Sequence, residues 1–383
     1  MAQNPLFSNT MRLFYHPRLY DLAGTEALFM RAIADNVRHH IRRCPEYAEI
    51  LRLRDFSPDS LTGTEDLGRL PPITTLFLKR RALYSAPKER LILKSTTSGT
   101  SGRVGFMGLD LPTSLHGIGM IATTFLTHRL PSPRLTNYAV LGYEPAKHNK
   151  IGAARTAYAM TFSAPALRRE YALRDTGDAY ESNLDALCDA LARYAKQNRP
   201  VRFIGFPAYF MFLLKELQKR GLRMRLHPRS LVILAGGWKQ FFAERIEKPE
   251  LYALSEETVG LGGSRIREFF GAVEHPIAYC DCANHHFHVP IYSRVLIRDV
   301  NTLEPVGYGV PGLLNLITPM VTSMPFSSVI TDDIATLYPG ESCGCGVTSP
   351  YFEIEGRVGM ADIKTCAAGA AELLSDLVRG SAE

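Results

Sequence analysis

The middle of the chain alternates between helical and extended apolar patterns, and this alternation restricts the possible folds more than any other feature. Apolar residues recur every three or four positions over 184–195, which predicts an amphipathic helix. The apolar runs 201–204 and 231–235 predict buried strands, and a helical pattern over 208–220 lies between them. Strands joined through helices by short connections are typical of a parallel α/β layer. Ligands bind such layers at the carboxyl ends of the strands, where we expect Gly236–Gly237 to lie.

The two ends of the chain differ from this middle part. The first ninety residues have a largely helical pattern. Beyond about residue 289, short extended segments alternate with turn signals, which predicts a smaller β-rich part. We expect helices over 27–43, 113–128 and 367–377, and strands over 138–141, 292–298 and 313–318.

Composition and charge argue against several classes of protein. Of the 383 residues, 46% are hydrophobic and 21% charged, so the chain can bury a large core and is not predicted to be disordered. The net charge is +6, and short basic runs such as 220–229 are expected to be solvated, which argues against a nucleic-acid partner. No apolar run approaches the roughly 20 residues that cross a bilayer, and 1–10 lacks the features of a signal peptide. We therefore expect a cytoplasmic protein with no membrane span.

The strongest local signal is a run of hydroxyl residues around two glycines, KSTTSGTSGR, over 94–103. Glycines let backbone N–H groups approach a phosphate closely, and hydroxyl groups and an arginine add further donors. The run lacks the Gly-Lys-Ser/Thr ending of the ordinary P-loop. The residues predicted to bind phosphate are Thr97, Ser98, Gly99, Thr100, Ser101, Gly102 and Arg103.

Six segments in chain order resemble motifs of the acyl-adenylate-forming superfamily, which includes acyl-CoA synthetases, adenylation domains and luciferases. The segment 97–102 resembles its phosphate-binding loop. The segment 235–238, with Gly236, Gly237 and Trp238, resembles the turn that lines the adenine pocket. The segment 270–274, which begins Phe270-Gly271, resembles the motif whose glutamate, here Glu274, assists magnesium and phosphate binding.

The three remaining matches lie in the distal part of the chain. The segment 309–313 resembles a Gly-x-x-Gly-Glu-Leu motif at the start of a strand, but this chain has no glutamate between its last two residues. The segment 331–333 resembles the one whose aspartate binds the ribose hydroxyls, and Asp333 aligns best. Gly356-Arg357 resembles the hinge that leads to the C-terminal lid domain.

The resemblance implies the fold and the chemistry. It implies an α/β adenylate-forming core over 1–356 with a β-rich distal part over 280–345, and a vestigial lid over 357–383. It also implies ATP and Mg²⁺ as cofactors. Attack of a carboxylate on the α-phosphorus of ATP depends more on charge neutralisation and in-line positioning than on an elaborate acid or base, and these motif residues supply both.

A second group of residues has the composition of a metal site. The seven cysteines include two Cys-x-Cys pairs, one in CDCANHHFH at 280–288 and one in CGCG at 343–346. Thiolates and imidazoles with a glycine-rich knuckle suit a closed tetrahedral Zn²⁺ site, which is structural because no position stays open for water. The phenylacetate-CoA-ligase branch of the superfamily has a similar set. We predict Cys282, His288, Cys343 and Cys345 as ligands, with Cys280 and His286 as substitutes.

The end of the chain resembles one particular branch of the superfamily. The residues after Arg357 are too few for a lid domain, and the run 356–366 resembles the acyl-protein synthetases of bacterial bioluminescence. In that family the acyl group passes from the adenylate to a cysteine near the C-terminus and then to a partner reductase. Cys366 matches that position, and a thiolate is a competent acyl acceptor. Lys239 is a candidate to replace the lysine of the missing lid.

The sequence therefore predicts an enzyme that activates a carboxylic acid, from the resemblance a fatty acid, as its acyl-adenylate and passes the acyl group to a thiol. The acyl-receiving partner is expected to be a reductase or a carrier protein. Two alternatives remain open: an acid–CoA ligase or carrier-loading synthetase acting on an aryl, acyl or amino acid, and a degenerate adenylation fold that serves only as a binding module.

Overall fold

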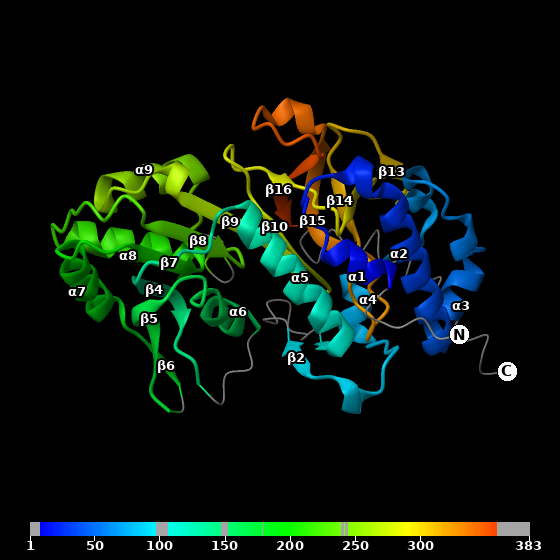
Figure 1. Ribbon diagram of the computed structural model, residues 1–383, viewed down its shortest axis with the longest axis horizontal. Coiled ribbons are helices and arrows are strands. Elements are labelled where there is room, and N and C mark those ends of the chain that lie inside the picture. The colour runs from blue at the N-terminus through cyan, green and yellow to red at the C-terminus, as the bar shows by residue number, and fades with distance from the viewer. Residues whose placement is uncertain are drawn as a thin grey trace.

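The computed structural model describes residues 8–96, 106–146, 152–177, 179–238, 241 and 244–357. Two seven-stranded sheets and a two-stranded hairpin form its β-structure (Figure 1). The predicted helix over 367–377 lies outside these residues. No helix of the described residues is long and apolar enough to cross a membrane.

The first sheet has the strand order β10-β9-β8-β7-β4-β5-β6. Its five central strands are parallel, and the strands at both edges are antiparallel to their neighbours. The strands are β4 (Thr136–Tyr143), β5 (Ala166–Asp175), β6 (Tyr180–Ser182), β7 (Val201–Gly205), β8 (Leu231–Ala235), β9 (Ile266–Ala272) and β10 (His275–Cys280). The predicted α/β class is thereby confirmed, and the predicted strand over 231–235 coincides with β8.

Helices cover both faces of this sheet because successive side chains of a strand point to opposite faces. Ala139 and Leu141 of β4 pack with the helices α7 (Leu184–Ala195), α8 (Pro207–Lys219) and α9 (Lys248–Val259). Tyr138 and Val140 pack instead with α6 (Gly152–Met160) and Phe125 of α5 (Leu111–Thr127). The result is a three-layer arrangement, with α7, α8 and α9 on one face of the sheet (Figure 1). The predicted helix over 184–195 coincides with α7.

The second sheet holds the distal part of the chain, in the order β11-β16-β15-β14-β12-β13, with β1 paired parallel to β15. The strands are β1 (Ile73–Thr74), β11 (Phe287–His288), β12 (Arg294–Arg298), β13 (Pro305–Val306), β14 (Gly312–Ile317), β15 (Ser328–Tyr338) and β16 (Tyr351–Arg357). The sheet therefore extends beyond the segment 280–345 at both ends. β1 joins it from the N-terminal part, a pairing that sequence periodicity did not predict.

The largest hydrophobic core lies between this sheet and the N-terminal helices (Figure 1). The first core helices are α1 (Asn9–Phe14), α2 (Leu22–Arg43) and α3 (Pro45–Leu53). α4 (Thr75–Arg80) follows β1, and the hairpin β2 (Leu93–Thr96) and β3 (Phe106–Leu109) precedes α5. The described residues also form short 3₁₀ turns: η2 (Pro58–Ser60), η3 (Thr64–Arg69), η4 (Lys88–Arg90), η6 (Gly263–Arg265) and η7 (Gly340–Cys343).

β10 and α5 connect the two halves of the molecule. β10 is an edge strand of the first sheet, yet its Ile277 and Tyr279 belong to the core of the second. Met120 of α5 lies in that same core, whereas Phe125 packs against the first sheet. The turn between β9 and β10 therefore lies where the two cores meet.

Candidate active site and metal centre

Gly236 and Gly237 directly follow β8, at the carboxyl edge of the parallel strands as the sequence predicts. Their φ angles are +84° and +66°, in the left-handed region that favours glycine. A Cβ at Gly237 would meet no atom within 4 Å, so the backbone conformation and not crowding selects glycine there. Trp238 comes next and packs against the core between the first sheet and the helices α7, α8 and α9.

The β9–β10 hairpin carries the next three predicted residues. Phe270 lies in β9, and its ring is 5.9 Å from Tyr279 and 5.5 Å from Phe352 between centroids, so it packs where the two sheets approach each other. A Cβ at Gly271 would lie 3.0 Å from the carbonyl oxygen of Ile277, which leaves little room for a side chain. The hairpin then turns at Glu274, directly before β10.

Glu274 is a buried carboxylate that lacks a partner for one of its oxygens. The residue is 6% exposed, and its Oε1 has no hydrogen-bond partner among the described residues. Burial raises the pKa of Glu274. The positive charges of Lys79 and Arg357 lower this pKa, and the negative charge of Asp332 raises it further. A desolvated carboxylate with a free oxygen fits a divalent cation such as Mg²⁺, which takes oxygen ligands.

Asp333 and Arg357 are opposite each other on the paired strands β15 and β16. The Nε hydrogen of Arg357 is donated to Oδ1 of Asp333 over 3.1 Å. The Asp333 backbone N–H is donated to the hydroxyl of Thr331 over 3.3 Å. Burial raises the pKa of Asp333, and the guanidinium of Arg357 lowers it. Because Arg357 and Asp332 also act on the pKa of Glu274, the structure brings the predicted Glu274, Asp333 and Arg357 into one charged cluster.

Two residues of this cluster were missed by sequence reasoning. The Thr75 hydroxyl donates to Oδ1 of Asp332 over 2.7 Å, and Lys79 Nζ donates to Oδ2 over 3.0 Å. Thr75 and Lys79 are four residues apart on α4, so they share one face of that helix. That spacing is a signal the sequence contains, but nothing in it points to Asp332 as the partner.

Several predicted residues are outside the described part of the chain and remain predictions. They are Thr97, Ser98, Gly99, Thr100, Ser101, Gly102, Arg103, Lys239 and Cys366. The motif at 309–313 lies within the described residues: β14 begins at Gly312, and Gly309 has a φ of +77°.

The four residues predicted as metal ligands lie together. Cys282, His288, Cys343 and Cys345 each offer one ligand atom, and these atoms all lie within 4.8 Å of one another. Cys282 Sγ is 3.5 Å from Cys343 Sγ, and Cys345 Sγ is 3.2 Å from His288 Nε2. The glycines of the CGCG run, Gly344 and Gly346, both have positive φ, which turns the backbone between the two sulfurs into a knuckle. Three thiols and one imidazole within this distance fit Zn²⁺.

The orientation of His288 suits a ligand. Its Nδ1 is 2.6 Å from the carbonyl oxygen of Ser349, so Nδ1 carries the proton and Nε2 is free to bind a metal. The two residues predicted as substitutes are placed differently. Cys280 packs in a core of the first sheet. His286 Nδ1 lies 3.1 Å from Cys343 Sγ, but its Nε2 pairs with Glu353 at 3.0 Å.

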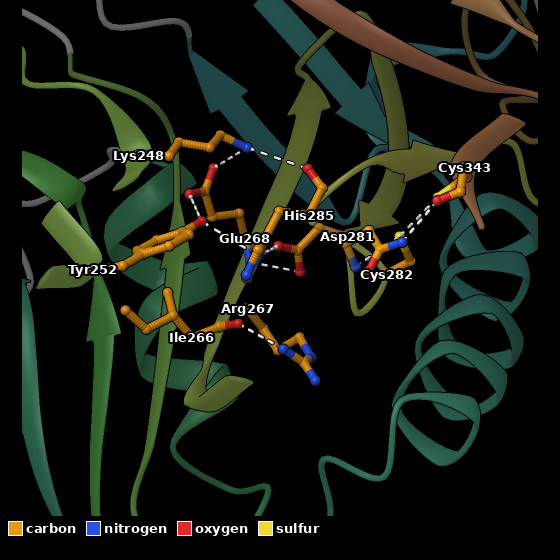
Figure 2. A network of polar contacts seen from close by, with 10 residues as sticks. Lys248, Tyr252, Ile266, Arg267, Glu268, Asp281, Cys282, His285 and Cys343 are labelled. Carbon is orange, nitrogen blue, oxygen red and sulfur yellow. Dashed lines mark hydrogen bonds and ion pairs between the residues drawn. The ribbon is translucent and has the colours of Figure 1, made fainter. Parts of the chain in front are cut away.

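Polar contacts fix the loop that carries Cys282 (Figure 2). Asp281 is fully buried, accepts the Glu268 backbone N–H over 2.9 Å and pairs with His285 Nδ1 over 2.7 Å. Asn284 donates its backbone N–H to Cys282 Sγ and its side-chain amide to the carbonyl oxygen of Cys343, over 3.3 and 2.7 Å. The ligand loop is therefore held both to β9 and to the CGCG knuckle.

The same network reaches α9, as Figure 2 shows. The Tyr252 hydroxyl donates to Glu268 Oε1 over 2.7 Å, and Lys248 Nζ pairs with Glu268 Oε2 over 3.0 Å. Lys248 Nζ also lies 3.5 Å from the carbonyl oxygen of His285. The candidate metal centre is thus anchored to the first sheet although two of its ligands follow β15.

Comparison with known proteins places this chain in a family. The family model described as acyl-protein synthetase, LuxE, matches residues 13–375. The chain belongs to this family. It is therefore an enzyme of the acid–thiol ligase class that activates and transfers acyl groups. The long-chain-fatty-acid–luciferin-component ligase of Vibrio harveyi is 25% identical over 364 residues, which cover 92% of this chain and 89% of that protein. The ligase of the same name from Aliivibrio fischeri is 27% identical over 161 residues, 39% of this chain and 42% of that protein.

Solved structures agree on the fold of this acyl-protein synthetase. A crystal structure of 2-hydroxyisobutyryl-CoA ligase in the postadenylation state, in complex with 2-HIB-AMP, has a TM-score of 0.64 and 16% identity, and the match covers 89% of this chain and 70% of that chain. A second structure of that ligase, in the thioesterification state, has a TM-score of 0.64 and 17% identity over 91% of this chain and 70% of that one. The predicted adenylate-forming fold is thereby confirmed.

Proposed function

We propose that this acyl-protein synthetase uses ATP to activate a long-chain fatty acid as its acyl-adenylate and passes the acyl group to a protein thiol. The observation that carries the proposal is the buried Glu274 carboxylate with its free oxygen, which lies in one charged cluster with Asp333 and Arg357. The family motifs assign Glu274 to magnesium and phosphate and Asp333 to the ribose hydroxyls, and Arg357 belongs to the motif that resembles the hinge. The fatty acid is supported by the names of the two bacterial relatives.

Each described residue has one task in this scheme. Gly236–Gly237 and Trp238 would line the adenine pocket. Asp333 would accept hydrogen bonds from the ribose hydroxyls, and Arg357 holds the Asp333 carboxylate in place. Glu274 would hold Mg²⁺, which supplies neutralising charge to the phosphates when bound. The segment 97–103 would surround the phosphates with hydroxyls and backbone N–H groups.

The chemistry then needs two displacements. A carboxylate oxygen of the acid attacks the α-phosphorus of ATP, the bond to the β-phosphate breaks, and pyrophosphate leaves with the electron pair. A thiolate next attacks the carbonyl carbon of the adenylate, AMP leaves, and a thioester forms. We assign the thiolate to Cys366 and a charge-neutralising role at the α-phosphate to Lys239.

We propose a structural role for the metal centre. Zn²⁺ held by Cys282, His288, Cys343 and Cys345 would fasten the loop after β10 to the knuckle after β15. Because β10 begins next to Glu274, this fastening supports the hairpin that presents Glu274. The four ligands leave no position for a reacting water, so the site has no part in the displacements.

Labelling with a radioactive fatty acid tests the proposal. Enzyme, Mg·ATP and labelled tetradecanoate are expected to give a protein-bound label that hydroxylamine removes, as it does from a thioester. Label recovered on CoA or on an added carrier protein, with none on the enzyme, would support the CoA ligase or carrier-loading alternative instead. No label on any acceptor would contradict acyl transfer.

A further inference from the structure

The helix α4 brings a lysine from the N-terminal part of the chain to the charged cluster. β1 pairs in parallel with β15, at Val329 and Ile330, so the helix that follows β1 begins beside the part of β15 that carries Asp332. Both carboxylate oxygens of Asp332 are then occupied, Oδ1 by the Thr75 hydroxyl and Oδ2 by Lys79 Nζ. The direction of the Lys79 side chain is thereby fixed.

Lys79 has more hydrogen-bonding capacity than this contact uses. An ammonium group has three donors, and within the described part of the chain Asp332 is the one partner of Lys79 Nζ. The side chain is 14% exposed, so it is largely shielded from solvent. The charge of Lys79 also lowers the pKa of Glu274, against the rise caused by burial, and Oε1 of Glu274 is buried without a hydrogen-bond partner among the described residues.

The cluster contains more carboxylates than cations, which favours an additional, positively charged ligand. Three carboxylates, Glu274, Asp332 and Asp333, face two cations, Lys79 and Arg357. Arg357 is 63% exposed and already bound to Asp333, which leaves Lys79 as the shielded cation of the pair. Glu274 suits a divalent cation, and the shielded ammonium group of Lys79 suits the phosphate oxygens that such a cation accompanies. Together the two groups fit a metal-bound polyphosphate.

We propose that Lys79 is a nucleotide-binding residue whose ammonium group contacts a phosphate of ATP beside Glu274. The inference rests on the proposed function, because it takes ATP as the ligand of the cluster. It adds a cation from the N-terminal part of the chain to a site whose motifs come from later segments.

The alternative for the same contacts is an ion pair that only fastens α4 to β15. The two cases predict different results for the two partners. Loss of either member of a purely structural pair weakens all ligand binding alike. If Lys79 binds phosphate, its loss weakens ATP but not adenosine, whereas loss of the Asp332 charge leaves Lys79 in place and removes a carboxylate that repels phosphate.

Titration calorimetry with Mg·ATP and with adenosine separates the two cases in the full-length protein. Lys79→Met is expected to weaken ATP binding by about tenfold or more, the range for a lost charge-assisted hydrogen bond, and to leave adenosine affinity unchanged. Lys79→Arg is expected to restore most of the ATP affinity. Asp332→Asn is expected to bind ATP at least as tightly as wild type. Lys219→Met, at an 81% exposed lysine on α8, is the matched control and should change neither affinity.

Other results would overturn phosphate binding by Lys79. Equal losses of ATP and adenosine affinity in Lys79→Met, or a loss in Asp332→Asn as large as in Lys79→Met, would overturn the inference and leave the proposed function standing. Wild-type protein that binds no ATP would overturn both. If Lys79→Met does not fold, as judged by circular dichroism, the Lys79→Arg and Asp332→Asn results decide by the same criteria.

Discussion

Arg357 binds the carboxylate of Asp333 across two paired strands, with 3.1 Å between Nε and Oδ1. The two residues belong to motifs that the sequence places far apart, and the antiparallel pairing of β15 with β16 makes them neighbours. Arg357 contacts Oδ1 of Asp333, and we assign a ribose hydroxyl to the same carboxylate. The first prediction tests that division of tasks.

Asp333→Asn is expected to raise the KM for ATP by about tenfold, because an amide is a poorer acceptor for a hydroxyl than a carboxylate. The folded protein should not lose stability near neutral pH. Burial raises the pKa of Asp333, so keeping it ionised opposes folding above its ordinary pKa, and the amide removes this opposition. Steady-state kinetics and thermal unfolding check the two parts. A lower Tm together with an unchanged KM would mean that Asp333 has only a structural role.

Glu274→Gln is expected to lower the rate of adenylation by about 100-fold or more, because the ligand that we propose for Mg²⁺ is lost. The same variant should unfold at a higher temperature than wild type in the absence of metal and nucleotide. The sign follows from the raised pKa of Glu274: the folded state binds a proton more tightly than the unfolded state, so stability from this group declines as pH rises through the ordinary carboxyl range. The difference in Tm should accordingly be larger at pH 8 than at pH 5. A variant that is less stable than wild type at pH 8 would contradict the burial of an ionised Glu274.

Purified protein is expected to contain about one zinc per chain, held by the four ligands within 4.8 Å of one another. Cys282→Ser and Cys345→Ser should each lower the zinc content and the Tm. Cys280→Ala is the matched control, since Cys280 packs in a core of the first sheet and should retain the metal. Elemental analysis gives the content directly. Absence of zinc from protein produced in cells grown with the metal would contradict a zinc centre in this protein.

Cys366→Ala is expected to abolish the acyl-enzyme but to keep the formation of the adenylate. Cys188→Ala is the control, because Cys188 is buried and burial raises its pKa to about 11, which makes it a poor nucleophile. The measurement is the label from a radioactive fatty acid that remains on protein in denaturing gels. Full labelling of the Cys366→Ala variant would exclude this cysteine as the acceptor.

The sequence predicted the parts of the fold that depend on local periodicity. The strand over 231–235 and the helix over 184–195 match β8 and α7 because a buried strand and an amphipathic helix each leave their own repeat in the sequence. β1 was missed because it has two residues and exists only through its pairing with β15. Pairing of that kind is set by tertiary contacts, which a single sequence does not display.

Some residues of the candidate site were predicted from the sequence, and others were missed. Glu274 and Asp333 were predicted because their segments resemble family motifs, and the four metal-binding candidates were predicted because their Cys and His runs have the composition of a zinc site. Lys79 was missed because its partner Asp332 lies 253 residues away, and a lysine in a short basic run at the end of a short helix has no distinguishing pattern. Its role becomes visible only when the side chains around Asp332 are in place.

Exchange of labelled pyrophosphate into ATP is the most direct test of adenylation, since it requires the first displacement and its reversal but no acyl acceptor. We expect exchange that depends on a long-chain fatty acid and on Mg²⁺, and that persists in Cys366→Ala. Exchange with only aryl or amino acids would keep the chemistry and change the substrate. No exchange with any of these acids would contradict adenylation by this protein and favour an adenylation fold that has kept only a binding role.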